Sequence, residues 1–200
     1  MQGRSRSASP DSGAPALRRK VRVAQSRYRG RMTTFDLRAL ALRSGEQRRE
    51  DVDVELEPLV YAGQEYELRP APAPAVLTAS RASSGTVYEL ELDVSLHGPC
   101  FRCLTDSALP LALRLREYQA TDPGGDDELR TPYVVDDRLD LSAWARDAIA
   151  LALPDKILCR PDCAGLCPVC GRDLNAEPHE HADEEADPRW AALQELREQP

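Results

Sequence analysis

The clearest indication of the fold is the segment Tyr88-Glu-Leu-Glu-Leu-Asp-Val-Ser-Leu-His97. Its even positions are apolar and its odd positions are polar, which is the two-residue period of a β-strand with one buried face and one wet face. Such one-sided alternation favours an antiparallel sheet. Gly98-Pro99 interrupts the pattern, and four leucines then resume it: Leu109, Leu111, Leu113 and Leu115. We expect the second run to be the hairpin partner of the first.

A shorter strand precedes this hairpin. Val52, Val54 and Leu56 alternate with acidic residues before a proline, as in a half-buried strand. The segment Pro70 to Pro74 is predicted to be a stiff Pro/Ala linker. After the hairpin, the acidic stretch Asp122 to Glu128 is predicted to be a loop that leads away from the sheet.

The period then changes to that of a helix. The apolar stripe consists of Leu141, Trp144, Ala145, Ala148, Ile149 and Ala152. Pro154 is expected to end this helix, which is long enough to cover one face of the sheet. A short terminal helix is predicted to begin at Asp187-Pro188, because Asp is a good N-cap and Pro suits the first helical position.

The expected fold class is therefore α+β, with an antiparallel β-sheet covered by a helix and followed by a cysteine-rich tail. We divide the chain into an extension (1–31), a core domain (32–154) and the tail (155–200). The extension is rich in Ser, Arg, Pro and Gly without periodicity, so we expect it to be disordered. It is either an RNA-binding or organelle-targeting arm, or a stretch upstream of a natural start at Met32.

The charge is distributed unevenly along the chain. The net charge is -8, yet residues 1–32 hold nine Arg or Lys and the single acid Asp11, a net charge of +8. The rest of the chain therefore carries -16. An acidic body repels phosphate backbones, because nucleic-acid affinity comes largely from Lys and Arg. Basic proteins are the partners that suit it better.

The sequence indicates a cytoplasmic protein. Its longest apolar stretch, Ala148 to Leu153, is far too short to cross a bilayer, and we find no secretory signal. In a reducing compartment, paired cysteines more often hold metal than form disulfides.

The six cysteines fall into two groups, Cys100-Phe-Arg-Cys103 and Cys159-x3-Cys163-x3-Cys167-x2-Cys170. Two thiolates that are separated by two residues can chelate one tetrahedral zinc ion. In the run from Cys167 to Gly171, a proline stiffens the turn and the glycine permits a tight backbone. A structural disulfide, a redox pair and unligated buried thiols are the competing interpretations.

The sequence alone allows several sets of zinc ligands. We predict a structural zinc site made of the four late cysteines, Cys159, Cys163, Cys167 and Cys170. Alternatively the last two cysteines pair with Cys100 and Cys103 and pin the tail to the hairpin. His179 and His181 are further candidate ligands or simply part of a solvated acidic loop. Together these residues would even fill two four-coordinate sites.

We predict no catalysis. A site closed by four thiolates has no open position for water or substrate. The chain has no phosphate-binding glycine loop and no Gly-x-Ser-x-Gly motif. The many acids lie along strand faces and in flexible runs, as solvated carboxylates do.

The motifs together resemble one known family. The matching runs are Phe35 to Leu37, Gly98 to Leu104, Asp140 to Pro154, Cys163 to Asn175 and Asp187 to Leu193. In this order they resemble the YceD family, the large ribosomal RNA subunit accumulation proteins, and the Gly-Leu-Cys-Pro-x-Cys-Gly run is the most specific of them.

The resemblance implies a bacterial cytoplasmic protein, or an organellar one in plants, that is needed for normal levels of large-subunit ribosomal RNA. We therefore expect a non-catalytic factor whose partner is a ribosomal protein or a pre-ribosomal particle of the large subunit, with no membrane or small-molecule substrate. The alternative is a metal-dependent enzyme of RNA maturation.

Overall fold

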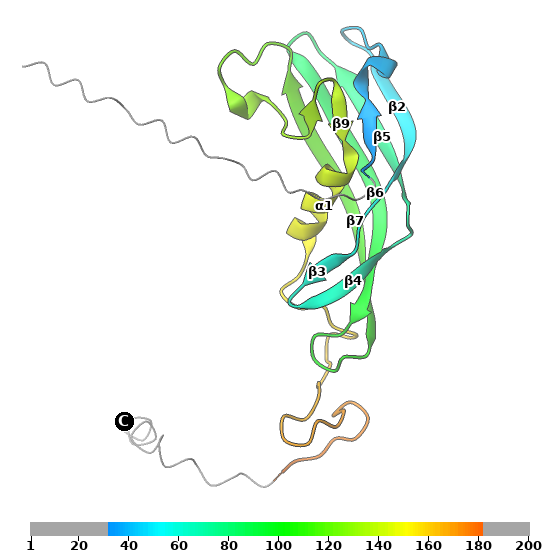
Figure 1. Ribbon diagram of the computed structural model, residues 1–200, viewed down its shortest axis with the longest axis vertical. Coiled ribbons are helices and arrows are strands. Elements are labelled where there is room, and N and C mark those ends of the chain that lie inside the picture. Colours follow the sequence, from blue (N-terminus) through cyan, green and yellow to red (C-terminus); the bar gives the residue numbers. More distant parts are fainter. Residues whose placement is uncertain (1–31, 182–200) are drawn as a thin grey trace, which may run out of the picture.

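The central feature of the fold is a long β-hairpin. The computed structural model describes residues 32–181, and its two longest strands are β6 (Gly85–Pro99) and β7 (Asp106–Ala120) (Figure 1). They pair antiparallel along their whole length, with Leu90 opposite Leu115 and Leu96 opposite Leu109. The even positions of β6 from Tyr88 to Leu96 are buried, so the predicted hairpin and its inward face are confirmed.

The other strands build on this hairpin. One sheet has the order β2-β5-β6-β4-β3, and β7 pairs with the other edge of β6. Its further members are β2 (Gln47–Val54), β3 (Leu59–Tyr61), β4 (Gln64–Arg69) and β5 (Ala73–Arg81). A smaller sheet has the order β1-β9-β8 and comprises β1 (Thr34–Asp36), β8 (Val134–Val135) and β9 (Arg138–Asp140). Two single-turn 3-10 helices are η1 (Leu37–Leu40) and η2 (Asp127–Leu129).

Two local expectations were wrong in part. A strand is present at Val52 and Val54, as predicted, but it begins at Gln47 and ends at Val54, so Leu56 lies outside it. The predicted Pro/Ala linker gives way to a strand at its end, because β5 begins at Ala73 and pairs with both β2 and β6. Its small side chains face large ones across the sheet, as where Ala79 lies opposite Tyr88. A small residue beside a large one fills the core evenly, although it gives no apolar run in the sequence.

The helix lies where the stripe predicts it. Helix α1 (Leu141–Ala152) starts at its N-cap Asp140, whose side chain accepts a hydrogen bond of 2.9 Å from the Ala143 amide. Its buried side chains are Leu141, Trp144, Ala145 and Ile149, and they belong to the same core cluster as the inward face of β6. The predicted apolar stripe does not extend to the last turn of the helix, because Ala152 is exposed.

The fold is thus mostly antiparallel sheet, with one α-helix among residues 32–181 and a cysteine-bearing tail. The described part of the tail, residues 155–181, contains no helix or strand, and an isolated bridge pairs Leu166 with Asp173. The expected N-terminal extension and the terminal helix at Asp187 lie outside the described residues. The division into domains at residues 32–154 and 155–200 stays a prediction. Within the described range no helix is long and apolar enough to cross a membrane.

Candidate metal centres

The cysteines and two of the histidines form two separate clusters. We call Cys100, Cys103, Cys159 and Cys163 the hairpin cluster, and Cys167, Cys170, His179 and His181 the distal cluster. In each cluster the candidate ligand atoms all lie within 4.8 Å of one another. Each cluster can therefore hold one metal ion with four protein ligands.

The grouping differs from the set predicted on sequence. The four late cysteines do not come together, because the first two join the hairpin pair and the last two join the histidines. The chain turns between Cys163 and Cys167, where the Leu166 amide donates to the Arg102 carbonyl oxygen at 3.1 Å. That contact holds one side of the tail against the hairpin. The ligands of a bound ion stay a prediction.

The hairpin cluster lies where the sheet meets the tail. The turn between β6 and β7 carries Cys100 and Cys103, as the sequence predicts. Cys100 and Cys163 are fully buried, Cys103 is buried, and Cys159 is exposed. The three buried cysteines form a second, small core with Leu158 and Leu166 packed against it.

The distances in the hairpin cluster suit a tetrahedral ion. The Cys100 and Cys163 sulfurs are 3.8 Å apart, and the Cys103 and Cys159 sulfurs are 3.6 Å apart. A tetrahedron with zinc–sulfur bonds of about 2.3 Å has sulfur–sulfur edges of about 3.8 Å. A disulfide requires about 2.05 Å, and all six cysteines are free thiols.

Hydrogen bonds prepare the hairpin cluster for a cation. Burial opposes ionisation of Cys100, but the backbone amides of Cys103, Cys159 and Arg102 outweigh it and lower the pKa of the Cys100 thiol to about 6. The Thr105 hydroxyl, whose oxygen is 3.0 Å from the Cys103 sulfur, lowers the pKa of that thiol. Loss of water and the neighbouring thiols raise the pKa of Cys159 to about 12. With its pKa raised in this way, Cys159 stays a thiol at neutral pH unless a cation is bound.

The tail is attached to the hairpin turn by backbone contacts. The Phe101 amide donates to the Ile157 carbonyl oxygen at 2.8 Å, and the Arg102 guanidinium donates to the Cys163 carbonyl oxygen at 2.6 Å. Gly165 has a φ of +85°, and a Cβ there would lie 3.3 Å from the Arg102 backbone oxygen. Only glycine combines this backbone with so close an approach.

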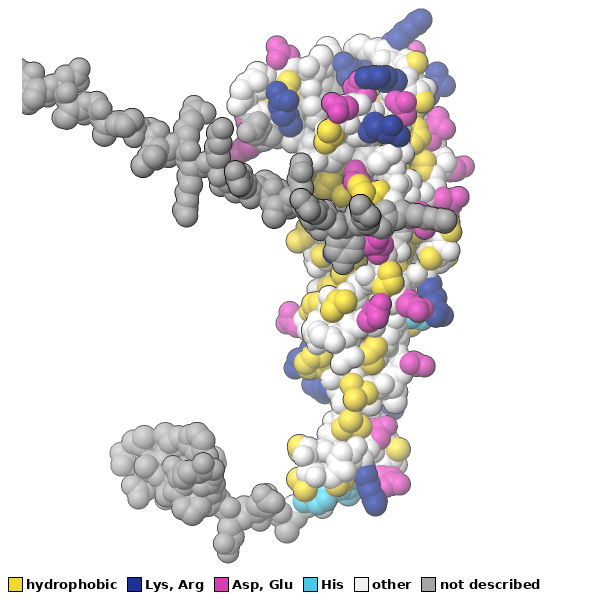
Figure 2. Space-filling model, viewed as in Figure 1, with side chains coloured by type: hydrophobic (Ala, Val, Ile, Leu, Met, Phe, Trp, Pro, Cys, Tyr) yellow, Lys and Arg dark blue, Asp and Glu magenta, His cyan; other side chains and the backbone are white. Residues whose placement is uncertain are grey.

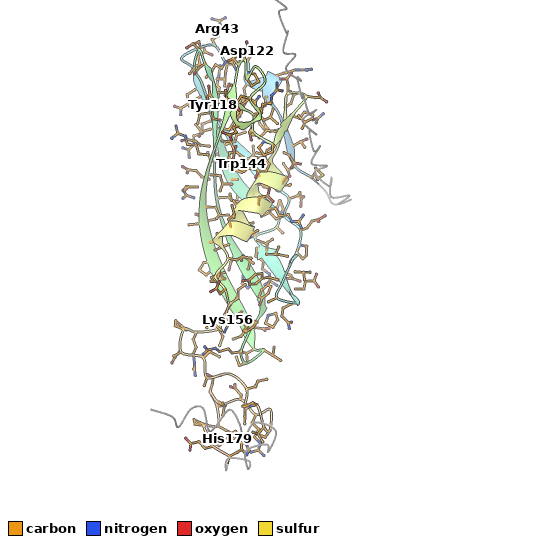
Figure 3. The ribbon with its side chains drawn as sticks, turned by 90° about the vertical axis from the view of Figure 1, so that its left-hand side faces the viewer. Arg43, Tyr118, Asp122, Trp144, Lys156 and His179 are labelled. Atoms are coloured by element: carbon orange, nitrogen blue, oxygen red, sulfur yellow. The ribbon has the colours of Figure 1, made fainter. Side chains whose placement is uncertain are left out.

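The distal cluster lies at the far end of the tail, where Figure 3 labels His179 and Figure 2 shows histidine side chains at the surface. A tight turn presents its two cysteines: the Cys167 amide donates to the Arg172 carbonyl oxygen, and the Gly171 amide donates to the Cys167 carbonyl oxygen. Gly171 has a φ of +74°, as the sequence analysis expects of a tight turn. Cys167 is buried, His179 is half-buried, and Cys170 and His181 are exposed.

The distal histidines approach the cysteines directly. His179 Nε2 lies 3.1 Å from the Cys170 sulfur, and its Nδ1 lies 2.7 Å from the Glu177 carbonyl oxygen. The His179 and His181 rings meet edge to face at 5.0 Å. The Cys170 and Val169 backbone amides lower the pKa of Cys167 to about 6, against the effect of burial. The Glu177 carbonyl and the Cys167 sulfur raise the pKa of His179.

Asn175 supports the hairpin cluster, a role that the sequence analysis missed. Its Nδ2 donates to the Cys163 sulfur at 3.5 Å and to Asp173 Oδ1. Its Oδ1 accepts from the Ala164 amide and the Arg160 guanidinium, each at 2.8 Å. The signal was present, since Asn175 closes the Cys163 to Asn175 run that carries the family resemblance. His97 belongs to neither cluster and is half-buried on β6, opposite Glu67 and Ala108.

Comparison with known proteins extends this picture. A model of the family described as "Large ribosomal RNA subunit accumulation protein YceD" matches residues 88–197, more than half of the chain. The chain belongs to the YceD family. The match begins within β6, at Tyr88, and includes all eight candidate ligands of this YceD protein. The family's description names accumulation of large-subunit ribosomal RNA and no reaction.

Several bacterial relatives are similar to this YceD protein. An uncharacterised protein of Mycobacterium tuberculosis is 42% identical over 124 residues, which are 60% of this chain and 59% of the relative. One of Mycobacterium leprae is 33% identical over 126 residues, 60% of this chain and 52% of the relative. The uncharacterised protein YlbN of Bacillus subtilis is 29% identical over 119 residues, 56% of this chain and 68% of the relative. The aligned part of the chain thus spans little more than half of the mycobacterial relatives. No solved structure matches the chain.

Proposed function

We propose that this YceD protein is a non-catalytic factor in the biogenesis of the large ribosomal subunit and acts in the cytoplasm through protein or ribonucleoprotein contacts. The family match over residues 88–197 is the observation that carries this proposal. It includes the hairpin, α1 and both clusters, so the proposed role draws on the sheet and the tail together.

The donor sets of the clusters support a role without catalysis. Each cluster offers four protein ligands, which is the full complement of a tetrahedral structural zinc site. A catalytic zinc site keeps one position open for water or substrate. An ion in either cluster would therefore hold chain segments together and would not activate a substrate.

We assign the stapling role to the hairpin cluster. Zinc bound there would tie the turn between β6 and β7 to residues 155–166. This contact already has three hydrogen bonds, each accepted by a backbone carbonyl oxygen. Thiolates that accept hydrogen bonds are well suited to zinc, because such partners fix the direction of the ligand. The cluster donates only sulfur, which zinc binds more readily than magnesium or calcium would.

The proposed partner surface is the outer face of the main sheet. The pairing of residues across the strands places Asp51 of β2, Glu91 of β6 and Arg114 of β7 on this face. Arg114 forms ion pairs with Glu91 and Asp93, at 3.8 and 3.3 Å. Asp51 and Asp53 take part in none of the ion pairs found among residues 32–181. Their charges are available to a basic partner.

A hollow on this outer face gives the surface a shape. It has a volume of about 400 Å³, and its walls carry Asp51 and Asp53 on one side and Glu91 and Asp93, both paired with Arg114, on the other. The β5 residues Pro74 and Val76 lie between the walls. Acidic walls with an apolar floor are complementary to Lys or Arg side chains, whose long aliphatic stems pack on apolar surface while the charge meets the carboxylates.

The hairpin turn adds apolar contact area near the hairpin cluster. Phe101 and Leu104 remain 42% and 56% exposed although they flank buried cysteines. Lys156 Nζ lies 5.4 Å from the centre of the Phe101 ring. A large exposed aromatic side chain on a rigid turn is a typical anchor in a protein interface. We therefore include this turn in the proposed partner surface.

The test is a crosslinking pull-down from growing bacterial cells that reads out both protein and RNA. We expect basic ribosomal proteins of the large subunit, or a particle that contains them. Asp51→Lys should weaken this capture, while Glu128→Lys, an equal change of charge in an exposed position outside the sheet, should leave it unchanged.

Two results would contradict the proposal. One is tight binding of bare ribosomal RNA by the chain from Met32 onward, with no protein captured. The other is cleavage or modification of ribosomal RNA by the purified protein, which would favour a metal-dependent RNA-maturation enzyme. In a strain that lacks the protein, the ratio of large- to small-subunit ribosomal RNA should fall and should be restored by the wild-type chain.

A further inference from the structure

The distal cluster differs from the hairpin cluster in the support that it receives from the fold. Among residues 164–181, the buried positions are Gly165 and Cys167. This segment has no helix or strand and contributes to neither core beyond Leu166, which packs against the three buried cysteines. Burial of apolar side chains is therefore too small to fix its conformation, and another interaction must order it.

We propose that the distal cluster is a second zinc site, filled independently of the hairpin cluster. Its ion orders residues 167–181 and exchanges more readily than the ion of the hairpin cluster. The site takes one divalent zinc ion through two cysteine thiolates and two histidine imidazoles. It does not depend on the ribosomal role, because it rests on the chain's own ligand atoms.

The ligand set is the first observation behind this proposal. Two cysteines and two histidines form a common tetrahedral zinc site, and their four ligand atoms already lie within 4.8 Å of one another. Zinc–sulfur and zinc–nitrogen bonds of about 2.3 and 2.0 Å give a sulfur–nitrogen edge of about 3.5 Å. The observed 3.1 Å between the Cys170 sulfur and His179 Nε2 needs only a small separation to admit the ion.

The orientation of His179 is the second observation. Its Nδ1 faces the Glu177 carbonyl oxygen at 2.7 Å, and that oxygen can only accept a hydrogen bond. Nδ1 therefore carries the hydrogen, which leaves a lone pair on Nε2, the atom that faces Cys170. A backbone carbonyl that fixes the tautomer in this way is the usual outer support of a zinc-bound histidine.

Hydrogen bonds and an ion pair join the two ends of the loop that carries these ligands. The Cys167 amide donates to the Arg172 carbonyl oxygen, and Arg172 forms an ion pair of 3.2 Å with Glu177, the residue whose carbonyl orients His179. The Glu177 amide donates in turn to the Asp173 carbonyl oxygen. The cysteine turn and the histidine segment thus meet through contacts other than the metal ligands.

The difference in exchange follows from burial and charge. Three of the four ligands are buried in the hairpin cluster, but one of four in the distal cluster. A chelator in solution can therefore reach the distal ion first. Zinc with two thiolates and two neutral imidazoles has no net charge, whereas zinc with four thiolates carries two negative charges and is held by more thiolate ligands.

Zinc content and release test this proposal on the full-length protein. Elemental analysis should find two zinc ions per chain, and a colorimetric chelator should remove them in two phases of equal size. The double variant His179→Ala/His181→Ala should retain one ion and lose the fast phase. His97→Ala changes the third histidine of the chain, which lies outside both clusters, and should retain two ions and both phases.

Cobalt substitution provides a readout that does not depend on the stability of a variant. Cobalt added to the metal-free wild-type chain should give absorption from both a four-sulfur and a two-sulfur, two-nitrogen tetrahedral site. One zinc ion per chain in the wild type would overturn the proposal. So would a His179→Ala/His181→Ala variant that retains two ions, or release in which the phase lost in that variant is the slow one.

Discussion

The two clusters use similar ligands in opposite surroundings. The hairpin cluster lies between the end of a long β-hairpin and the start of the tail, with three buried sulfurs and a small apolar core around it. The distal cluster lies at the end of the described chain, with one buried ligand and no core of its own. Spacing along the chain therefore identifies candidate ligands, whereas the fold around them determines what an ion there would stabilise.

Serine substitution of one sulfur in each cluster should give the largest difference. Cys100→Ser should abolish binding at the hairpin cluster and release the tail, since a buried ligand is lost where zinc binding is coupled to folding. Amide exchange of Phe101 and Leu166 should accelerate at least ~100-fold, or about 3 kcal/mol. Cys170→Ser should leave both rates within about threefold, because its sulfur belongs to the distal cluster.

Hydrogen exchange measured residue by residue checks this prediction. The amides of β6 serve as the internal control, because the core of the sheet is separate from the hairpin cluster. If Cys170→Ser accelerates exchange at Phe101 as much as Cys100→Ser does, the two clusters are one unit and the comparison fails.

The cysteines should favour the folded, metal-free protein most strongly near pH 9. The pKa of Cys100 falls from 9.0 to about 6 in the folded chain, so its contribution to stability is present above pH 9 and is lost as the pH falls to about 6. The pKa values of Cys103 and Cys167 are also lowered, which acts in the same direction. The pKa of Cys159 rises from 9.0 to about 12, so its contribution is present below pH 9 and is lost as the pH rises to about 12.

Chemical unfolding of the metal-free chain at several pH values measures this effect. Thiolate absorbance should show that Cys100 and Cys167 ionise first, near pH 6, and replacement of either by Ser should remove one thiol from that phase. Stability that falls steadily from pH 6 to pH 9 would show that the amides around Cys100 do not favour the thiolate.

Asn175 should matter for the hairpin cluster more than for the distal one. Asn175→Ala removes the donor to the Cys163 sulfur and the acceptor for the Ala164 amide. Loss of such an outer partner typically lowers metal affinity about 10- to 100-fold. We expect faster release of the slow zinc ion by about this factor, measured in a chelator assay, and little change in the fast one. Asn175→Asp keeps the acceptor, so its release rate for the slow ion should lie between those of the wild type and Asn175→Ala.

Much of the hairpin could be predicted from sequence, because the alternation of apolar and polar residues from Tyr88 to Leu96 allows only one face of an antiparallel strand to be buried. The strand β5 could not, since it begins with small residues and proline, and its alanines lie beside larger residues across the sheet, as Ala75 does beside Leu92. The division of Cys163 and Cys167 between clusters could not be predicted either. Their spacing fits one site or two, and the contact of Leu166 with the hairpin turn decides between them.

The smallest expected effect concerns the hairpin turn itself. Leu104 has a φ of +62°, a left-handed conformation that costs a non-glycine residue about 1–2 kcal/mol, and its side chain is mostly exposed. Leu104→Gly should therefore stabilise the fold by about 0.5 kcal/mol after the greater freedom of glycine in the unfolded chain is counted. The same change should weaken capture of the proposed protein partner.

Thermal unfolding and the pull-down together decide the role of this residue. Leu104→Ala is the matched control, because it removes most of the side chain and keeps the strain. A loss of stability in Leu104→Gly with unchanged capture would show that the leucine supports the turn and contacts no partner.

The most direct test of the two-cluster account is an anomalous diffraction map at the zinc absorption edge, from crystals of the full-length protein grown with zinc. We expect two peaks, one surrounded by Cys100, Cys103, Cys159 and Cys163 and the other by Cys167, Cys170, His179 and His181. A single peak surrounded by Cys159, Cys163, Cys167 and Cys170 would contradict it.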